Sequence, residues 1–266
     1  MVKLKQAAAA LAVVGIASPA WGAGFINGGF EDGTTNGWTI GGGYRAPYYN
    51  NTYSPVMTPA LFLPGGAAYN ASIANGHSAV IGTGYVDPNV GGVIGTTVYS
   101  GNYSLRVEDT TAGGYASVAT QEVQNYTDAN IYFAWKAVLL GAHNDYDAAT
   151  MIITLTDKTT STELIRREYN AASGGGGVDP RFSIYNNNFY TPDWQIEQLP
   201  INASLQGHDF VLSVLAADCE PTAHWGYVYL DGFGAVTPPV GGVPVPGGLA
   251  LLGIGALGLG FARRKA

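Results

Sequence analysis

Ile131-Tyr-Phe-Ala-Trp-Lys-Ala-Val-Leu-Leu140 is the strongest strand candidate in the sequence, because β-branched and aromatic residues fill it and Asn130 and Gly141 bound it. Met151-Ile-Ile-Thr-Leu-Thr156 repeats this composition after a polar connection. Further strands are expected at residues 103–107, 164–169, 194–199, 210–216 and 227–233, with shorter candidates at 79–81 and 93–94. These short runs, separated by Gly, Asn, Asp and Pro, predict an all-β protein.

The order and spacing of these runs favour two antiparallel sheets over a parallel α/β sheet. Phe210-Val-Leu-Ser-Val-Leu215 is apolar on both faces, which predicts a central strand. Residues 44–99 and the Ser173–Gly177 glycine run are rich in turn-forming residues and predict loops. We therefore expect one β-sandwich domain over residues 24–236.

The N-terminus has the layout of a secretory signal peptide. Met1-Val-Lys-Leu-Lys5 supplies a basic start, Ala7–Ile16 an apolar stretch, and residues 17–23 a small-residue exit. A permanent membrane helix is the alternative, but the apolar stretch is too short to span a bilayer. We expect residues 1–23 to be removed during export, with cleavage after Ala23.

The C-terminus combines a proline linker, an apolar run and a basic end. Residues 237–246 form the Pro/Gly linker, and residues 247–262 are uncharged and end at Arg263-Arg264-Lys265. Basic residues after an apolar segment hold it in a membrane with the positive end in the cytoplasm. The run is short and glycine-rich for a transmembrane helix, which favours a transient anchor in the inner membrane over residues 247–266.

This tail resembles the PEP-CTERM sorting signal of Gram-negative bacteria, in which a proline element precedes an apolar helix and an arginine cluster. The matching residues are Pro244, Pro246, Gly247, Arg263, Arg264 and Lys265, with Val245 where the family usually has glutamate. The resemblance implies handling by an exosortase-type sorting enzyme and by the secretion machinery, with delivery to the cell surface or extracellular matrix. A variant sorting enzyme and a plain C-terminal anchor are the alternatives.

The body of the protein is strongly acidic. Residues 24–243 contain seven of the basic residues and all nineteen acidic ones, a net charge of −12. Nucleic acids and anionic lipids need basic surfaces, so the composition argues against them as partners. Cys219 is the only cysteine, which excludes an intrachain disulfide and predicts a buried, unreactive thiol.

Three motifs in order resemble the galactose-binding-like jelly roll shared by many carbohydrate-binding modules. They are Asn27-Gly-Gly-Phe-Glu-Asp-Gly33 followed by Gly37-Trp38, then Ser100-Gly-Asn-Tyr-Ser-Leu-Arg-Val107, then Gly226-Tyr-Val-Tyr-Leu-Asp-Gly-Phe233. The resemblance implies a β-sandwich whose first and last strands lie together. Because one fold hosts many functions, function does not follow from it.

Glu31, after the expected first strand, and Asp231, in the last, would then meet. Two carboxylates at close range repel one another unless a cation joins them, and Ca²⁺ accepts carboxylate oxygens in flexible geometry. The resemblance also implies a structural calcium ion at these positions. The alternative is that Glu31 faces solvent and Asp231 caps a turn.

Aromatic side chains beside amides suit a hydroxyl-rich ligand, because an aromatic face stacks on a sugar ring. The candidates are Tyr48, Tyr49, Tyr185, Tyr190 and Trp194. The alternative is that these tyrosines fill half-buried positions. Trp38 and Trp135 are expected in the core.

No catalytic motif is present in the sequence. The four histidines, at positions 77, 143, 208 and 224, are far apart and show no metal-binding spacing, and no Gly-x-Ser-x-Gly motif occurs. We predict that the protein is not an enzyme but an exported polysaccharide-binding or structural component of the cell surface or matrix. An adhesive scaffold without a defined ligand and a glycan-active hydrolase are the alternatives.

Overall fold

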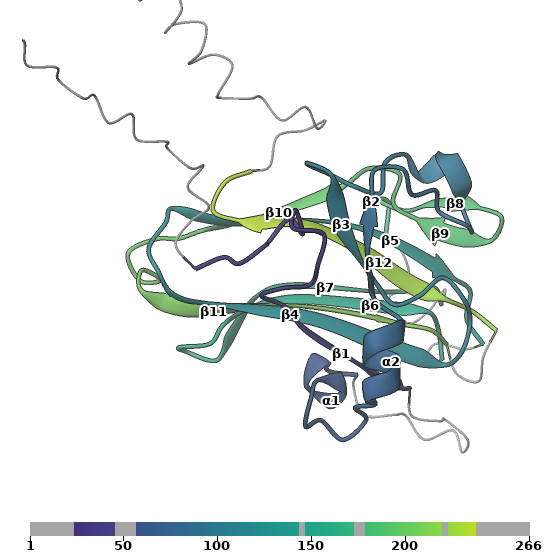
Figure 1. The fold of residues 1–266 in the computed structure, drawn as a ribbon, viewed down its shortest axis with the longest axis horizontal. Helices are drawn as coiled ribbons and strands as arrows, with labels where there is room; N and C mark the ends of the chain where they lie inside the picture. Colours follow the sequence, from purple (N-terminus) through teal and green to yellow (C-terminus); the bar gives the residue numbers. More distant parts are fainter. Residues whose placement is uncertain (1–23, 46–56, 144–146, 173–178, 220–222, 238–266) are drawn as a thin grey trace, which may run out of the picture.

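The computed structural model describes residues 24–45, 57–143, 147–172, 179–219 and 223–237. Within these ranges, two antiparallel β-sheets stack face to face, and two short helices lie outside them (Figure 1). The predicted all-β fold, an antiparallel β-sandwich, is confirmed. The expected signal peptide, the linker beyond residue 237 and the C-terminal helix lie outside the described residues. Among the residues described, no helix is long and apolar enough to cross a membrane.

The first sheet has five strands, in the spatial order β1 (Thr39–Tyr44), β4 (Tyr115–Tyr126), β11 (His208–Ala217), β6 (Thr150–Asp157) and β7 (Thr162–Asn170). The second has seven, in the order β2 (Ala79–Gly82), β3 (Tyr103–Val107), β12 (Gly226–Gly234), β5 (Asn130–Leu140), β9 (Asn188–Tyr190) and β8 (Ser183–Tyr185), with β10 (Gln195–Pro200) also paired to β5. β11 is central in its sheet, as its two apolar faces predicted.

The core lies between the sheets and follows the two-residue period of the strands. Ile131, Phe133 and Trp135 of β5 point into it, whereas Lys136 of the same strand points to the outer face. Trp135 is fully buried and Trp38 is 8% exposed, so both core predictions are confirmed.

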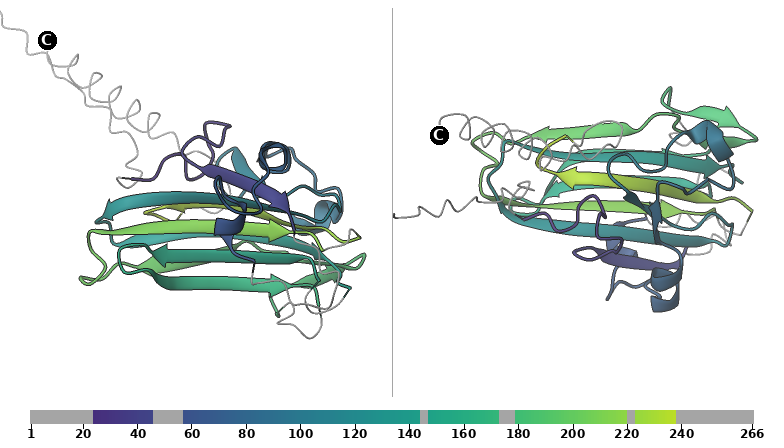
Figure 2. Two further views of the ribbon diagram at one scale, coloured as in Figure 1. Left: turned by 90° about the horizontal axis from the view of Figure 1, so that it is seen from below. Right: turned by 45° about the horizontal axis from the view of Figure 1, so that its top comes forward.

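The outer face of the first sheet is covered by α1 (Pro59–Phe62) and α2 (Ala71–Gly76), which lie beside β1 (Figure 2). The strand they cover contains Gly41-Gly-Gly43. A Cβ at Gly43 would lie 1.8 Å from the carbonyl oxygen of Ala68, and one at Gly41 would lie 2.3 Å from that of Phe62. Glycine is therefore required here because the neighbouring backbone approaches too closely for any side chain.

The outer face of the second sheet is covered by residues 83–102, which we call the cover loop. Val90 and Ile94 of this loop pack with Tyr227 and Tyr229 of β12 in a second apolar cluster. The strand predicted at residues 93–94 is wrong, because Gly91–Ile94 forms a 3₁₀ turn, η1.

The opening segment also differs from the prediction. Instead of a strand before Glu31, residues 24–38 form successive turns, in which Asn27 and Phe30 take positive φ values of 51° and 59°. The segment nevertheless lies against the last strand, because the backbone N–H of Phe233 donates to the carbonyl oxygen of Gly28 at 3.0 Å.

Candidate functional site

An open pocket of about 580 Å³ lies on the outer side of the second sheet, between the cover loop and the segment that leads into β10. Its lining is partly aromatic and aliphatic and partly polar, and includes Thr96, Tyr99, Lys136, Asp193, Trp194 and Ile196. A small number of polar groups among apolar walls is the usual character of a ligand site.

Trp194 is held in a fixed orientation in this pocket. Its indole N–H donates to the carbonyl oxygen of Thr96 at 3.0 Å, and its ring centroid lies 5.7 Å from that of Tyr99. The indole is half-buried, so part of its surface remains open to the pocket. A side chain fixed before a ligand arrives loses little conformational entropy on binding.

Lys136 joins the two walls of the pocket. Its ammonium group donates to the carbonyl oxygen of Ile94 in the cover loop and, at 2.9 Å, to that of Pro192 before β10. The ammonium nitrogen also lies 5.8 Å from the centroid of the Trp194 ring, within cation–π range. Burial lowers the pKa of Lys136 to about 8.

The other aromatic candidates are placed differently. Tyr185, on β8, is 40% exposed, and Tyr190, on β9, is 8% exposed and packs in the apolar cluster under the cover loop. Tyr190 therefore presents little of its ring to a ligand, because the ring packs against the other residues of that cluster. Tyr48 and Tyr49 lie outside the described residues.

Glu31 and Asp231 both accept hydrogen bonds from the backbone of the loop that precedes β3. Glu31 accepts the backbone N–H groups of Asn102 and Tyr103 at 3.0 and 3.1 Å. Asp231 Oδ2 accepts the backbone N–H groups of Tyr99 and Ser100 at 2.9 and 3.1 Å. Hydrogen bonds to the opening segment and to β12 therefore fix the end of the cover loop.

The environment of Asp231 suits a cation. The residue is fully buried, and within the described part of the chain its Oδ1 has no hydrogen-bond partner. Burial raises the pKa of Asp231 to about 8, and the negative charge of Glu31 raises it as well. A buried carboxylate oxygen without a hydrogen-bond partner is a donor of the kind that Ca²⁺ accepts.

A largely buried polar cluster elsewhere in the domain joins His77 to two carboxylates. His77 Nδ1 lies 2.6 Å from Glu108 Oε1 and 3.3 Å from Asp109 Oδ2. The hydrogen bond that Glu108 accepts from the imidazole raises the pKa of His77 above its usual value.

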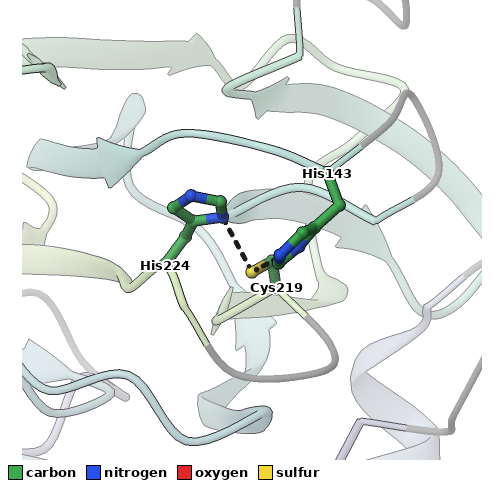
Figure 3. A group of neighbouring side chains, drawn as sticks. All are labelled: His143, Cys219 and His224. Atoms are coloured by element: carbon green, nitrogen blue, oxygen red, sulfur yellow. Dashed lines mark hydrogen bonds between the residues drawn. The ribbon is translucent and has the colours of Figure 1, made fainter.

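A further cluster, around Cys219, is not evident from the sequence. His143, after β5, and His224, before β12, both contact the thiol of Cys219, which follows the end of β11 (Figure 3). Burial lowers the pKa of His224, and the nearby His143 lowers it as well. Cys219 is buried, as predicted, but its neighbours include two imidazoles rather than apolar groups alone. The spacing of the histidines in the sequence gave no sign of this group, because the fold brings together residues that are distant in the sequence.

No family model matches this sequence, and a search of curated proteins finds no match. Solved structures similar in fold include a carbohydrate-binding module in complex with beta-1,4-galactotriose, at 11% identity, with 80% of this chain and 96% of that chain covered and a TM-score of 0.40. A carbohydrate-binding module specific for non-crystalline cellulose matches at 14% identity, with 80% and 94% covered and a TM-score of 0.35. The K1 cleaved adhesin domain of Lys-gingipain from Porphyromonas gingivalis W83 matches at 11%, with 76% and 92% covered and a TM-score of 0.32.

Proposed function

We propose that this protein is an exported, non-catalytic polysaccharide-binding component of the cell surface or extracellular matrix. The observation that carries the proposal is the pocket at Trp194. A half-buried indole, locked by Thr96 and Tyr99, offers a surface on which a sugar ring stacks. The carboxylate of Asp193 and the hydroxyl of Thr96 supply hydrogen-bonding groups beside it.

The negative charge of the domain favours neutral over acidic polysaccharides as ligands. Its net charge of −12 repels acidic polysaccharides, so we propose a neutral one. Among the residues that line the pocket, Asp193 is the single carboxylate, whereas glycoside hydrolysis generally uses a pair. This supports binding without cleavage. In the proposal, Glu31 and Asp231 hold a structural Ca²⁺ that fixes the end of the cover loop.

Delivery to the surface rests on the two ends of the chain. The proposal is that residues 1–23 direct export and that the tail from Pro244 to Lys265 is handled by an exosortase-type enzyme. Intact mass and C-terminal sequencing of protein recovered from the native cell surface test this. We expect loss of the signal peptide and of everything after about residue 246. A chain that still ends at Ala266 would contradict processing by a sorting enzyme and would favour a plain C-terminal membrane anchor.

Affinity electrophoresis of the full-length protein through gels that contain neutral polysaccharides tests the binding function. We expect retardation that saturates with polysaccharide concentration, and a loss of affinity of roughly tenfold or more in Trp194→Ala, which corresponds to about 1.4 kcal/mol. Trp225→Ala is the matched control, because Trp225 is also half-buried, donates one indole hydrogen bond and packs against the same cluster, but does not line the pocket.

Three outcomes would contradict binding at this pocket. They are equal retardation of the two tryptophan variants, self-assembly of the protein with no retardation in any gel, and shortening of the polysaccharide. The second would favour the scaffold and the third the hydrolase.

A further inference from the structure

The nitrogen atoms of two histidines converge on one sulfur. His143 Nδ1 lies 3.4 Å and His224 Nδ1 lies 3.0 Å from the Sγ of Cys219, and the centroids of the two imidazole rings are 4.7 Å apart (Figure 3). All three potential ligand atoms lie within 4.8 Å of one another. Both imidazole nitrogens face the sulfur, and the three atoms lie close enough together for one ion to contact all of them.

We propose that His143, Cys219 and His224 form a binding site for one thiophilic transition-metal ion, with Zn²⁺ as the best fit. Bond lengths of about 2.3 Å to sulfur and 2.0–2.1 Å to nitrogen put the sulfur and nitrogen of a tetrahedral zinc site about 3.6 Å apart. The observed separations of 3.4 Å for His143 and 3.0 Å for His224 are shorter than this value, so the two side chains would move slightly away from the sulfur to hold the ion. One thiolate with two imidazoles is also a donor set that suits copper, whereas calcium and magnesium prefer oxygen.

Asp147 supplies a carboxylate at the edge of the site. Its Oδ2 lies 3.5 Å from His143 Nδ1, the same nitrogen that faces the sulfur. In a Cys–His–Asp nucleophilic relay, the carboxylate and the thiol contact different nitrogens of the imidazole ring. Here both contact Nδ1, so the geometry argues against such a relay. Asp147 instead lies beside one of the proposed ligands, His143.

The strands hold the ligands close together without a metal. Cys219 follows the end of β11 and His224 precedes β12, and the backbone N–H of Cys219 donates to the carbonyl oxygen of His224 at 3.1 Å. Gly141, after β5, has a φ of +58°, and a Cβ there would lie 2.8 Å from Cδ2 of His224. Glycine at this position therefore leaves room for the imidazole. The sulfur is buried, and the His143 side chain, 37% exposed, gives an ion access from solvent.

Titration of the metal-free full-length protein with Co²⁺ tests the site, because a thiolate bound to Co²⁺ gives a charge-transfer absorption in the near ultraviolet. A tetrahedral ion adds intense visible bands. We expect both absorptions to saturate at one Co²⁺ per chain and to disappear on addition of Zn²⁺. Cys219→Ser removes the charge-transfer absorption. His143→Ala and His224→Ala each weaken binding by more than the roughly 10–100-fold that is lost when a residue that only supports a metal ligand is removed.

His208→Ala is the matched control, because His208 is a partly buried histidine that pairs with Asp157 at 2.8 Å, outside the cluster. It should bind Co²⁺ as the wild type does. If Cys219→Ser fails to fold, the wild-type spectrum and the His143→Ala variant still decide the matter, because the half-exposed His143 can be truncated without opening the core. Co²⁺ binding without a charge-transfer absorption would overturn the proposal. Unchanged affinity in both histidine variants would also overturn it.

Discussion

Replacing Asp87 with alanine should release the cover loop from the second sheet. Asp87 is 2% exposed, and its Oδ1 accepts the backbone N–H groups of Asn89 and Val90 at 2.8 and 2.9 Å. Its carboxylate also accepts the hydroxyl groups of Tyr227 at 2.9 Å and of Tyr229 at 2.7 Å. One carboxylate thus joins the loop to β12 through four donors.

The expected loss follows from the donors left behind. Each buried donor without a partner costs about 1–3 kcal/mol. The hydroxyl groups of Tyr227 and Tyr229 are fully buried, whereas the two amides of the turn can reach water when the loop loosens. We therefore expect Asp87→Ala to lower the free energy of unfolding by about 2–5 kcal/mol.

Urea unfolding of the wild type, Asp87→Ala, Tyr229→Phe and the double variant measures this loss and its origin. In the double variant, the orphaned hydroxyl of Tyr229 is gone. The free energy of unfolding of the double variant should therefore be about 1–2 kcal/mol higher than the sum of the two single losses predicts. Additive losses, or a loss below about 1 kcal/mol in Asp87→Ala, would refute the account of the cover loop.

Two further predictions concern charge. Ca²⁺ should raise the melting temperature of the wild type in scanning calorimetry, because a ligand at a hundred times its Kd stabilises the native state by about 2.7 kcal/mol. Asp231→Asn and Glu31→Gln should not respond, and equal responses in all three would contradict a calcium site there. The raised pKa of His77 means that its pairing with Glu108 stabilises the fold below about pH 6.5 and loses this effect as pH rises through the folded-state pKa. The stability difference between wild type and His77→Gln, from urea unfolding across pH, should therefore shrink with rising pH, and a constant difference would contradict it.

The strands whose sequences alternate or are apolar throughout could be predicted from sequence. β5, β6 and β11 contain the β-branched and aromatic residues that favour strands, and the structure places them as expected. β1 could not be predicted, since Gly41-Gly-Gly43 has low strand propensity and its glycines serve the close approach of the backbone around α1 and α2. Sequence shows the composition of a segment but not the backbone that packs over it.

The candidate sites divide in the same way. Glu31 and Asp231 could be chosen from sequence because the first and last motifs of the domain contain them. In the structure, both bind the loop that precedes β3. Trp194 could be chosen as an aromatic residue beside amides, but its partners in the pocket come from the cover loop. The group around Cys219 could not be predicted, because it requires the positions of three separate strand ends. The nearest signal was His224, five residues after Cys219 between two predicted strands.

The most direct test of polysaccharide binding at the Trp194 pocket is hydroxyl-radical footprinting of the full-length protein with and without a saturating neutral polysaccharide, read by mass spectrometry. The proposal predicts that the polysaccharide protects Trp194 and Ile196, the latter 44% exposed in the pocket lining. Tyr185, 40% exposed outside that lining, should be oxidised equally in both samples. Protection of Tyr185 with no change at Trp194 would contradict it, and so would the absence of protection at any residue.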